Sequence, residues 1–224
     1  MLHSTREYQM SRNMNTRRSL YIICLLLLSA VGNKLDAQTV VKSVRQANDS
    51  TNHALIHQIG FDVRPGYVAP TNSFLEGDNA QRQKIDRSLS LHLKYAFQFS
   101  KDSYLGRLYP HAYQGIGVSH NTFYNSAELG NPVAVYAFQG APIVRLSSCL
   151  SLDYEWNFGA SFGWKQYDEH SNWYNDAIGS KINAYINLGF VLNWQFYPQW
   201  KLAAGVDFTH FSNGNTRYPN GGLN

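Results

Sequence analysis

The sequence predicts an all-β fold, an antiparallel outer-membrane β-barrel, and three observations support this prediction. Apolar and polar residues alternate through most of the chain after residue 54, which is the period of a strand with one apolar face. The chain contains 15 Tyr, 12 Phe and 5 Trp but only 15% charged residues, as the aromatic girdles of a membrane barrel require. Long and short connections also alternate along the chain, as outer loops and inner turns do in such barrels.

The first 37 residues are predicted to be a secretory signal sequence. Arg17 and Arg18 precede an apolar run, residues 20–31, which is too short to cross a bilayer as a helix. Cleavage is expected after Ala37, which removes Cys24 and leaves Cys149 unable to form an intramolecular disulfide. Residues 38–54 are polar without a period, and we interpret them as a flexible lead-in to a barrel that occupies residues 55–224.

The net charge of the chain does not indicate a nucleic-acid partner. The full sequence has a formal charge of +4, from 19 basic and 15 acidic residues. Removing residues 1–37 takes away five of the basic and two of the acidic residues, which leaves about +1. A nearly neutral protein has no overall field to attract a polyanion.

The period-two pattern divides the barrel region into seven strands. The clearest begins at Leu150, where eight successive alternate positions up to Trp164 are apolar, and so long a run is hard to obtain by chance. The predicted strands are residues 56–68, 89–99, 113–120, 132–144, 150–165, 182–197 and 200–212.

The connections between these strands predict which ends lie outside. Residues 69–87, 121–131 and 166–180 are long and are assigned to the outer surface, whereas residues 145–148 and 198–199 are short inner turns. The inner connection 101–112 is longer than expected. Because barrels usually have an even number of strands and lipid does not tolerate open edges, we expect an eighth, closing strand to be missing after Asn224, so that the barrel is C-terminally incomplete. A soluble periplasmic sandwich is the competing architecture, although its strands would be about half as long.

Charged residues within the strands are assigned to the barrel interior. Lys94, Asp153, Glu155 and Lys181 are expected to pair with one another there, because an unpaired charge in the lumen is costly. In the outer loop, Asp168, Glu169 and His170 are adjacent and form a candidate calcium site, with a solvated loop as the simpler interpretation. Trp173 and Tyr174 in the same loop have the character of interfacial aromatics.

The end of the last strand carries the most informative motif, His210-Phe211-Ser212-Asn213. Residues two apart on a strand face the same side, roughly 7 Å apart at the backbone, close enough for an imidazole to take a hydroxyl proton. His210 and Ser212 share their face with Phe208 and Val206, so in a membrane barrel they point toward lipid. An ordinary polar strand end is the alternative reading of the same residues.

The tail from His210 to Leu223 resembles the lipid A 3-O-deacylase (PagL-like) family, also called acyloxyacyl hydrolases, in which a His-x-Ser-Asn strand end leads to a Pro-Asn-x-Gly turn. The resemblance implies an outer-membrane serine esterase that removes an ester-linked acyl chain from the lipid A of lipopolysaccharide, without metal or cofactor. It implies that Ser212 is the nucleophile and His210 the base. Asn213 and Gly214 then match the region that stabilises the oxyanion.

The resemblance also implies an acid fourteen residues after the histidine, and this chain has Asn224 there. An amide oxygen orients the imidazole but does not offset the charge of imidazolium. We therefore expect either a slower His-Ser-Asn hydrolase or an acid supplied from beyond Asn224. Asp207 is a poor substitute because its parity directs it into the lumen.

Two other functions are compatible with the sequence. A non-catalytic barrel, structural or adhesin-like, would use its loops to bind a partner and His210 and Ser212 only to end a strand. An outer-membrane phospholipase would share the serine nucleophile but would be expected to dimerise and use calcium.

Overall fold

The computed structural model describes residues 38–44 and 55–224, and these residues form one antiparallel barrel. Each strand pairs with the next in sequence, and β8 pairs with β1. The described helices, α2 (Ser73–Glu76) and α3 (Tyr104–Leu108), are single turns between strands. The strands are β1 (Gln38–Val44), β2 (Leu55–Tyr67), β3 (Arg87–Phe99), β4 (Tyr113–Thr122), β5 (Gly130–Arg145), β6 (Leu150–Trp164), β7 (Ile182–Tyr197) and β8 (Trp200–Ser212).

Closure of the barrel corrects the prediction of a missing last strand. The eighth strand is β1, which lies in the segment interpreted as a flexible lead-in. It pairs with β2 from Gln38 to Val44 and with β8 from Gln38 to Lys42. The barrel therefore closes at its N-terminal side and needs no strand after Asn224 to do so. A single closed sheet also excludes the two-sheet sandwich. The predicted signal sequence, residues 1–37, lies outside the described residues.

The two faces of each strand have the polarity that the alternation predicts. On β8, Phe208 is 60% exposed and points away from the barrel, whereas its neighbours in the other register include Ala203 at 3% and Phe211 at 4%. The same holds for β7, where Leu188 is exposed and Asn187 is buried. The outer wall of the barrel is thus a continuous apolar surface over several strands, which is the surface that a lipid environment favours. Among the described residues, no helix has the length and apolar character to cross a bilayer.

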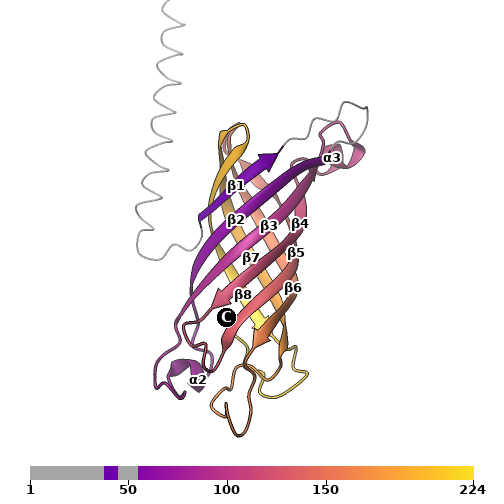
Figure 1. The fold of residues 1–224 in the computed structure, drawn as a ribbon. Helices are drawn as coiled ribbons and strands as arrows, with labels where there is room; N and C mark the ends of the chain where they lie inside the picture. The colour runs from indigo at the N-terminus through magenta and orange to yellow at the C-terminus, as the bar shows by residue number, and fades with distance from the viewer. Residues whose placement is uncertain (1–37, 45–54) are drawn as a thin grey trace, which may run out of the picture. The chain divides into compact units, whose positions relative to one another are not determined.

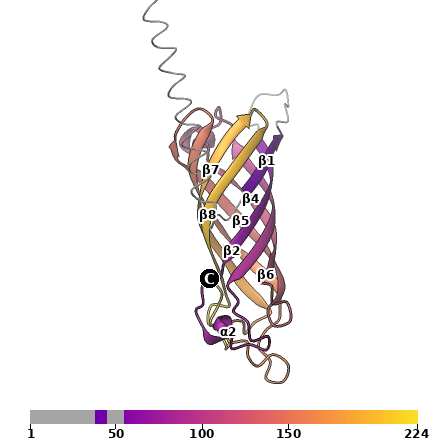
Figure 2. The same cartoon turned by 90° about the vertical axis from the view of Figure 1, so that its left-hand side faces the viewer.

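The connections separate into two ends as predicted. The segment that contains α2, the segment between β4 and β5, and the segment between β6 and β7 lie at one end of the barrel together with the last residues of the chain (Figures 1 and 2). The α3 segment and the short turns after β5 and β7 lie at the other end (Figure 1). We call these the loop end and the turn end.

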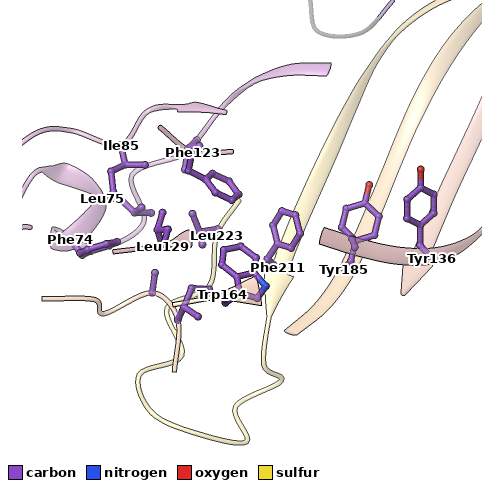
Figure 3. Packing of buried hydrophobic residues seen from close by; sticks show 14 of the residues in the cluster. Phe74, Leu75, Ile85, Phe123, Leu129, Tyr136, Trp164, Tyr185, Phe211 and Leu223 are labelled. Carbon is purple, nitrogen blue, oxygen red and sulfur yellow. The ribbon is translucent and has the colours of Figure 1, made fainter. Parts of the chain in front are cut away.

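A hydrophobic cluster fills the loop end. Leu75, Leu129 and Ile178 come from three different connecting segments and are almost fully buried. They pack with residues of the barrel mouth, and Figure 3 shows Phe211, Trp164 and Leu223 side by side with Tyr185 and Tyr136 further along the strands. The stacked rings of Phe123 and Trp164, 5.6 Å apart at their centroids, belong to the same cluster. The loop end is therefore a packed cap, with the connecting segments fixed relative to β8.

Beyond this cluster, the interior of the barrel contains charged side chains. Lys94 Nζ lies 2.5 Å from Glu155 Oε1, and Arg64 lies 2.6 Å from Asp62 and 3.0 Å from Asp207. The expected pairing of Lys94 with Glu155 is confirmed, but the expected participation of Lys181 is wrong. Lys181 precedes β7 and is exposed at the loop end.

Candidate functional site

β8 places His210 and Ser212 on the outer wall of the barrel. Their partners across the β7 ladder are Ile186 and Ala184, whereas Phe211 between them turns into the hydrophobic cluster. His210 and Ser212 are both half-buried, and Phe208 one step along the same face is exposed. The structure thus has the predicted parity, and both side chains point outward from the barrel wall.

The residues after Ser212 fold back along the end of β8. Phe211 and Leu223 form an antiparallel bridge, with N–H to O distances between them of 2.9 and 3.0 Å. Leu223 is 1% exposed because its side chain enters the hydrophobic cluster beside Phe211. The burial of Leu223 thus fixes where the next residue lies.

Gly222 makes this close approach possible. Its φ of +67° is a conformation that side chains other than glycine rarely adopt. A Cβ at this position would lie 2.9 Å from the carbonyl oxygen of Phe211 and 3.3 Å from Cε1 of His210. The glycine therefore allows the tail to pass directly over the histidine.

Asn224 reaches His210 as a result. Its Oδ1 lies 2.7 Å from Nδ1 of the imidazole, and its backbone oxygen accepts a hydrogen bond of 2.9 Å from the N–H of Ala69. An oxygen acceptor at Nδ1 favours the tautomer in which Nδ1 carries the proton and Nε2 has a free lone pair. This is the form of histidine that accepts a proton from a hydroxyl.

Ser212 makes a local hydrogen bond in this structure. Its Oγ accepts from the N–H of Gly214 at 2.9 Å, and among the described residues no hydrogen bond joins it to His210. Asn213 uses its side chain within the following turn, where Nδ2 donates to the carbonyl of Arg217 and Oδ1 accepts from the N–H of Asn215. The predicted oxyanion residues thus lie beside the serine hydroxyl, with the Gly214 N–H already directed at Oγ.

The acidic residues of the strands face the lumen, on the opposite side of the sheet from this pair. Asp207 pairs with Arg64 in the lumen, and Asp153 and Glu155 are buried there. Their orientation agrees with the expectation that none of them replaces the acid at position 224. The sequence analysis missed Arg64 and Asp62, which pair inside the barrel. They are two residues apart on β2, and this spacing of charged residues was the signal that could have placed both in the lumen.

The predicted calcium residues form a turn. Asp168 Oδ1 accepts hydrogen bonds from the backbone N–H groups of His170 and Ser171 and from the Ser171 hydroxyl, at 2.9 to 3.1 Å. These bonds, the Ser171 N–H first, hold the pKa of Asp168 below its usual range. In the described part of the chain, no three His, Cys, Asp or Glu side chains are arranged to hold a metal ion.

Comparison with known families identifies the chain. The model of the family lipid A 3-O-deacylase (PagL) matches residues 89–224, more than half of the sequence. The chain belongs to this family. The match confirms the resemblance carried by the His210 to Leu223 tail and extends it over β3 to β8. Comparisons with curated proteins and with solved structures gave no significant match.

Proposed function

We propose that the protein is an outer-membrane serine esterase that removes an ester-linked acyl chain from lipid A, with Ser212 as nucleophile and His210 as base. Membership of the lipid A 3-O-deacylase family supports the substrate class. The observation that carries the proposal for the residues is the outward-facing His210-Ser212 pair with an amide oxygen 2.7 Å from the far nitrogen of the imidazole.

The chemistry follows from this arrangement. Rotation of the Ser212 hydroxyl toward Nε2 of His210 lets the imidazole take its proton while Oγ attacks the acyl carbonyl. The negative charge that develops on the carbonyl oxygen is stabilised by the backbone N–H groups at the start of the turn, where Gly214 N–H leaves Oγ for the oxyanion. His210 then returns the proton to the sugar oxygen as the ester bond breaks. Water, deprotonated by the same imidazole, then attacks the acyl carbonyl, and His210 returns that proton to Ser212 Oγ as the bond to the fatty acid breaks.

Asn224 has an orienting role in this proposal. Its amide oxygen holds Nδ1 as a donor and thereby keeps Nε2 available. Because the amide is neutral, it stabilises the transient imidazolium less than a carboxylate does. We therefore expect a slower enzyme than one with an acid at this position.

The location of the pair agrees with the substrate. His210 and Ser212 lie at the loop end of β8, on the apolar wall of the barrel. Acyl chains in a bilayer contact that wall directly, whereas lumen residues do not meet them. With the loop end outward, the serine faces the outer leaflet, where lipopolysaccharide is found.

The test is the mass of lipid A in an outer membrane that contains the full chain or its Ser212→Ala variant. We expect loss of one acyl chain with the parent and none with the variant. The matched control is Ser119→Ala, which removes a serine from the lumen face of β4 and should leave deacylation intact. Unchanged lipid A with both the parent and Ser212→Ala would favour the non-catalytic barrel. Loss of acyl chains from phospholipid instead would favour the phospholipase.

A further inference from the structure

An exposed aromatic stack projects from the segment between β6 and β7. The rings of Trp173 and Tyr174 are 3.5 Å apart at their centroids, with 29° between their planes. Arg82, from the α2 segment, lies 5.3 Å from the centroid of the Tyr174 ring and donates to its hydroxyl. Asp78 in turn pairs with Arg82 at 2.9 Å. The stack thus joins two connecting segments, and Trp173, at its end, is 55% exposed.

The backbone that carries the stack is held by buried amides. Asn175 is fully buried, and its Nδ2 donates to the carbonyls of Glu128 and Lys165. Its Oδ1 accepts from the N–H groups of Ala177 and Ile178. Ile178 is itself anchored in the hydrophobic cluster. An exposed Trp on so well fixed a segment is preorganised for contact, because little conformational entropy is lost when it binds.

This segment also contacts the tail that carries Asn224. The N–H groups of Gly221 and Gly222 donate to the carbonyls of Asp176 and Ala177, at 3.3 and 3.0 Å. A Cβ on Gly179 would collide with the Pro219 carbonyl, so the two backbones lie in direct contact. The aromatic stack and the His210-Ser212 pair are therefore attached to the same packed unit of the loop end.

The position of Trp173 decides whether its ligand is an acyl chain or the polar part of a lipid. The apolar wall follows the strands, and the stack lies in the middle of a connection that begins after Trp164 and ends before Ile182. Acyl chains contact the strands, so a ligand group at Trp173 lies beyond them, at the level of the polar part of a lipid. A flat aromatic face beside polar side chains suits the C–H faces and hydroxyl groups of a sugar, since Trp combines a large apolar surface with a polar edge.

We propose that the exposed face of Trp173, backed by Tyr174 and Arg82, binds the saccharide part of the glycolipid whose acyl ester is presented to Ser212. The proposal rests on the proposed function and adds a binding site that holds the sugar while the acyl chain lies on the barrel wall. It makes Trp173 a determinant of binding to a glycolipid over a phospholipid, without a part in the chemistry.

The experiment uses the full chain with Ser212→Ala, so that nothing is hydrolysed, and measures binding of the acyl-free saccharide of lipid A. Trp173→Ala should weaken this binding about three- to tenfold, the range expected for one aromatic contact. Trp173→Phe should recover most of it. The matched control is Tyr104→Ala, which removes an aromatic of similar exposure from α3 at the turn end and should have no effect.

Three outcomes would overturn the proposal: no saccharide binding by the Ser212→Ala chain, equal binding after Trp173→Ala, or an effect of Trp173→Ala only on insertion into glycolipid-free phospholipid vesicles. The last would identify the stack as a membrane anchor. Deacylation by the chain with Ser212 intact is measured separately. Saccharide binding that depends on Trp173 in a chain that does not deacylate lipid A would reject the proposed function and retain the sugar site.

Discussion

The charged groups of the lumen and the polar pair on the outer wall occupy opposite faces of the same closed sheet, and their partners differ in kind. In the lumen, Lys94, Glu155 and Arg64 each have an oppositely charged partner within 4 Å. On the outer wall, His210 and Ser212 stand beside Ile186 and Phe208, and the partner of His210 comes from the tail instead of the sheet. The charged side chains inside the barrel pair with one another, whereas a polar pair on an apolar wall is costly to keep, and its presence there points to a function.

The largest effect that tests this contrast is expected from His210→Ala. Without the imidazole, Ser212 has no base, and deacylation should fall by about 10³- to 10⁴-fold or more. The free energy of unfolding should change little, because the side chain is half-buried on the outer wall and outside the hydrophobic cluster. Both quantities are measured on the same purified barrel, by release of fatty acid and by urea titration. A large loss of stability with activity retained per folded molecule would make His210 a structural residue.

The opposite result is expected in the lumen. Glu155→Ala removes the nearest carboxylate of Lys94, which keeps only Asp62 at 3.7 Å, and one of the three carboxylates around Arg64. Loss of one partner from a buried ion pair costs up to about 3–5 kcal/mol. Activity per folded molecule should remain near that of the parent. Lys181→Met is the matched control, since it removes an exposed lysine at the loop end and should shift the urea midpoint hardly at all. If Glu155→Ala abolishes deacylation in a fully folded barrel, the lumen charges also contribute to activity, and the proposed division between the two faces is wrong.

Asn224→Asp tests the outer-wall site by giving His210 a charged partner in place of a neutral one. A carboxylate beside Nδ1 of His210 stabilises imidazolium, which the amide does not, and an Asp in this role is worth up to about 10⁴-fold in serine proteases. Because Asp is set here into a site shaped by Asn, we expect a rise in kcat of about 10- to 100-fold. Asn224→Ala should lower kcat, because nothing then fixes the tautomer. A pH profile of kcat for the three chains is the measurement, and identical profiles would remove Asn224 from the site.

The strands and their faces could be predicted from the sequence because they depend on a local period. β6 begins at Leu150 and β8 ends at Ser212, as the alternation indicated. β1 could not be found this way, because Gln38–Val44 is short and partly polar and owes its conformation to pairing with β2 and β8. The cap was equally hidden, since Leu75 and Leu129 lie in connections without any period.

The candidate site was predictable only in part. Parity alone placed His210 and Ser212 on one outward face, but their relation to Asn224 came from a resemblance and not from spacing. In the structure, that relation depends on a bridge between Phe211 and Leu223 and on a glycine with positive φ. Long-range contacts of this kind leave no local signal. The pairing of Lys181 was wrong for a related reason, because β7 begins one residue after it.

A moderate effect is expected from Gly222→Ala, which tests whether the tail must pass this close to His210. The positive φ costs about 1 kcal/mol for alanine, and the added Cβ meets the Phe211 carbonyl and the imidazole edge. Displacing Asn224 by even 1 Å should reduce deacylation about tenfold or more. Gly163→Ala is the control, because its φ is also positive but a Cβ there would meet nothing nearer than 3.7 Å. Equal activity losses in both variants would assign the effect to backbone strain alone.

The smallest effect concerns pH and the segment that carries Trp173. The pKa of Asp168 is lowered because its carboxylate accepts three hydrogen bonds in the turn, so the turn is stabilised above the unfolded pKa, near 3.9, and this stabilisation is lost as pH falls through the folded value. Pepsin cleavage within residues 165–181, corrected with a reference peptide, should therefore rise as pH is lowered from 5 to 2. Asp168→Asn keeps the Oδ1 acceptor without the charge and should flatten this rise. Since Asn175 and Ile178 anchor the same segment independently of pH, the increase in cleavage should be confined to this segment. Increased cleavage elsewhere in the barrel over the same pH range would show that acid opens the packed cap and not the Asp168 turn alone.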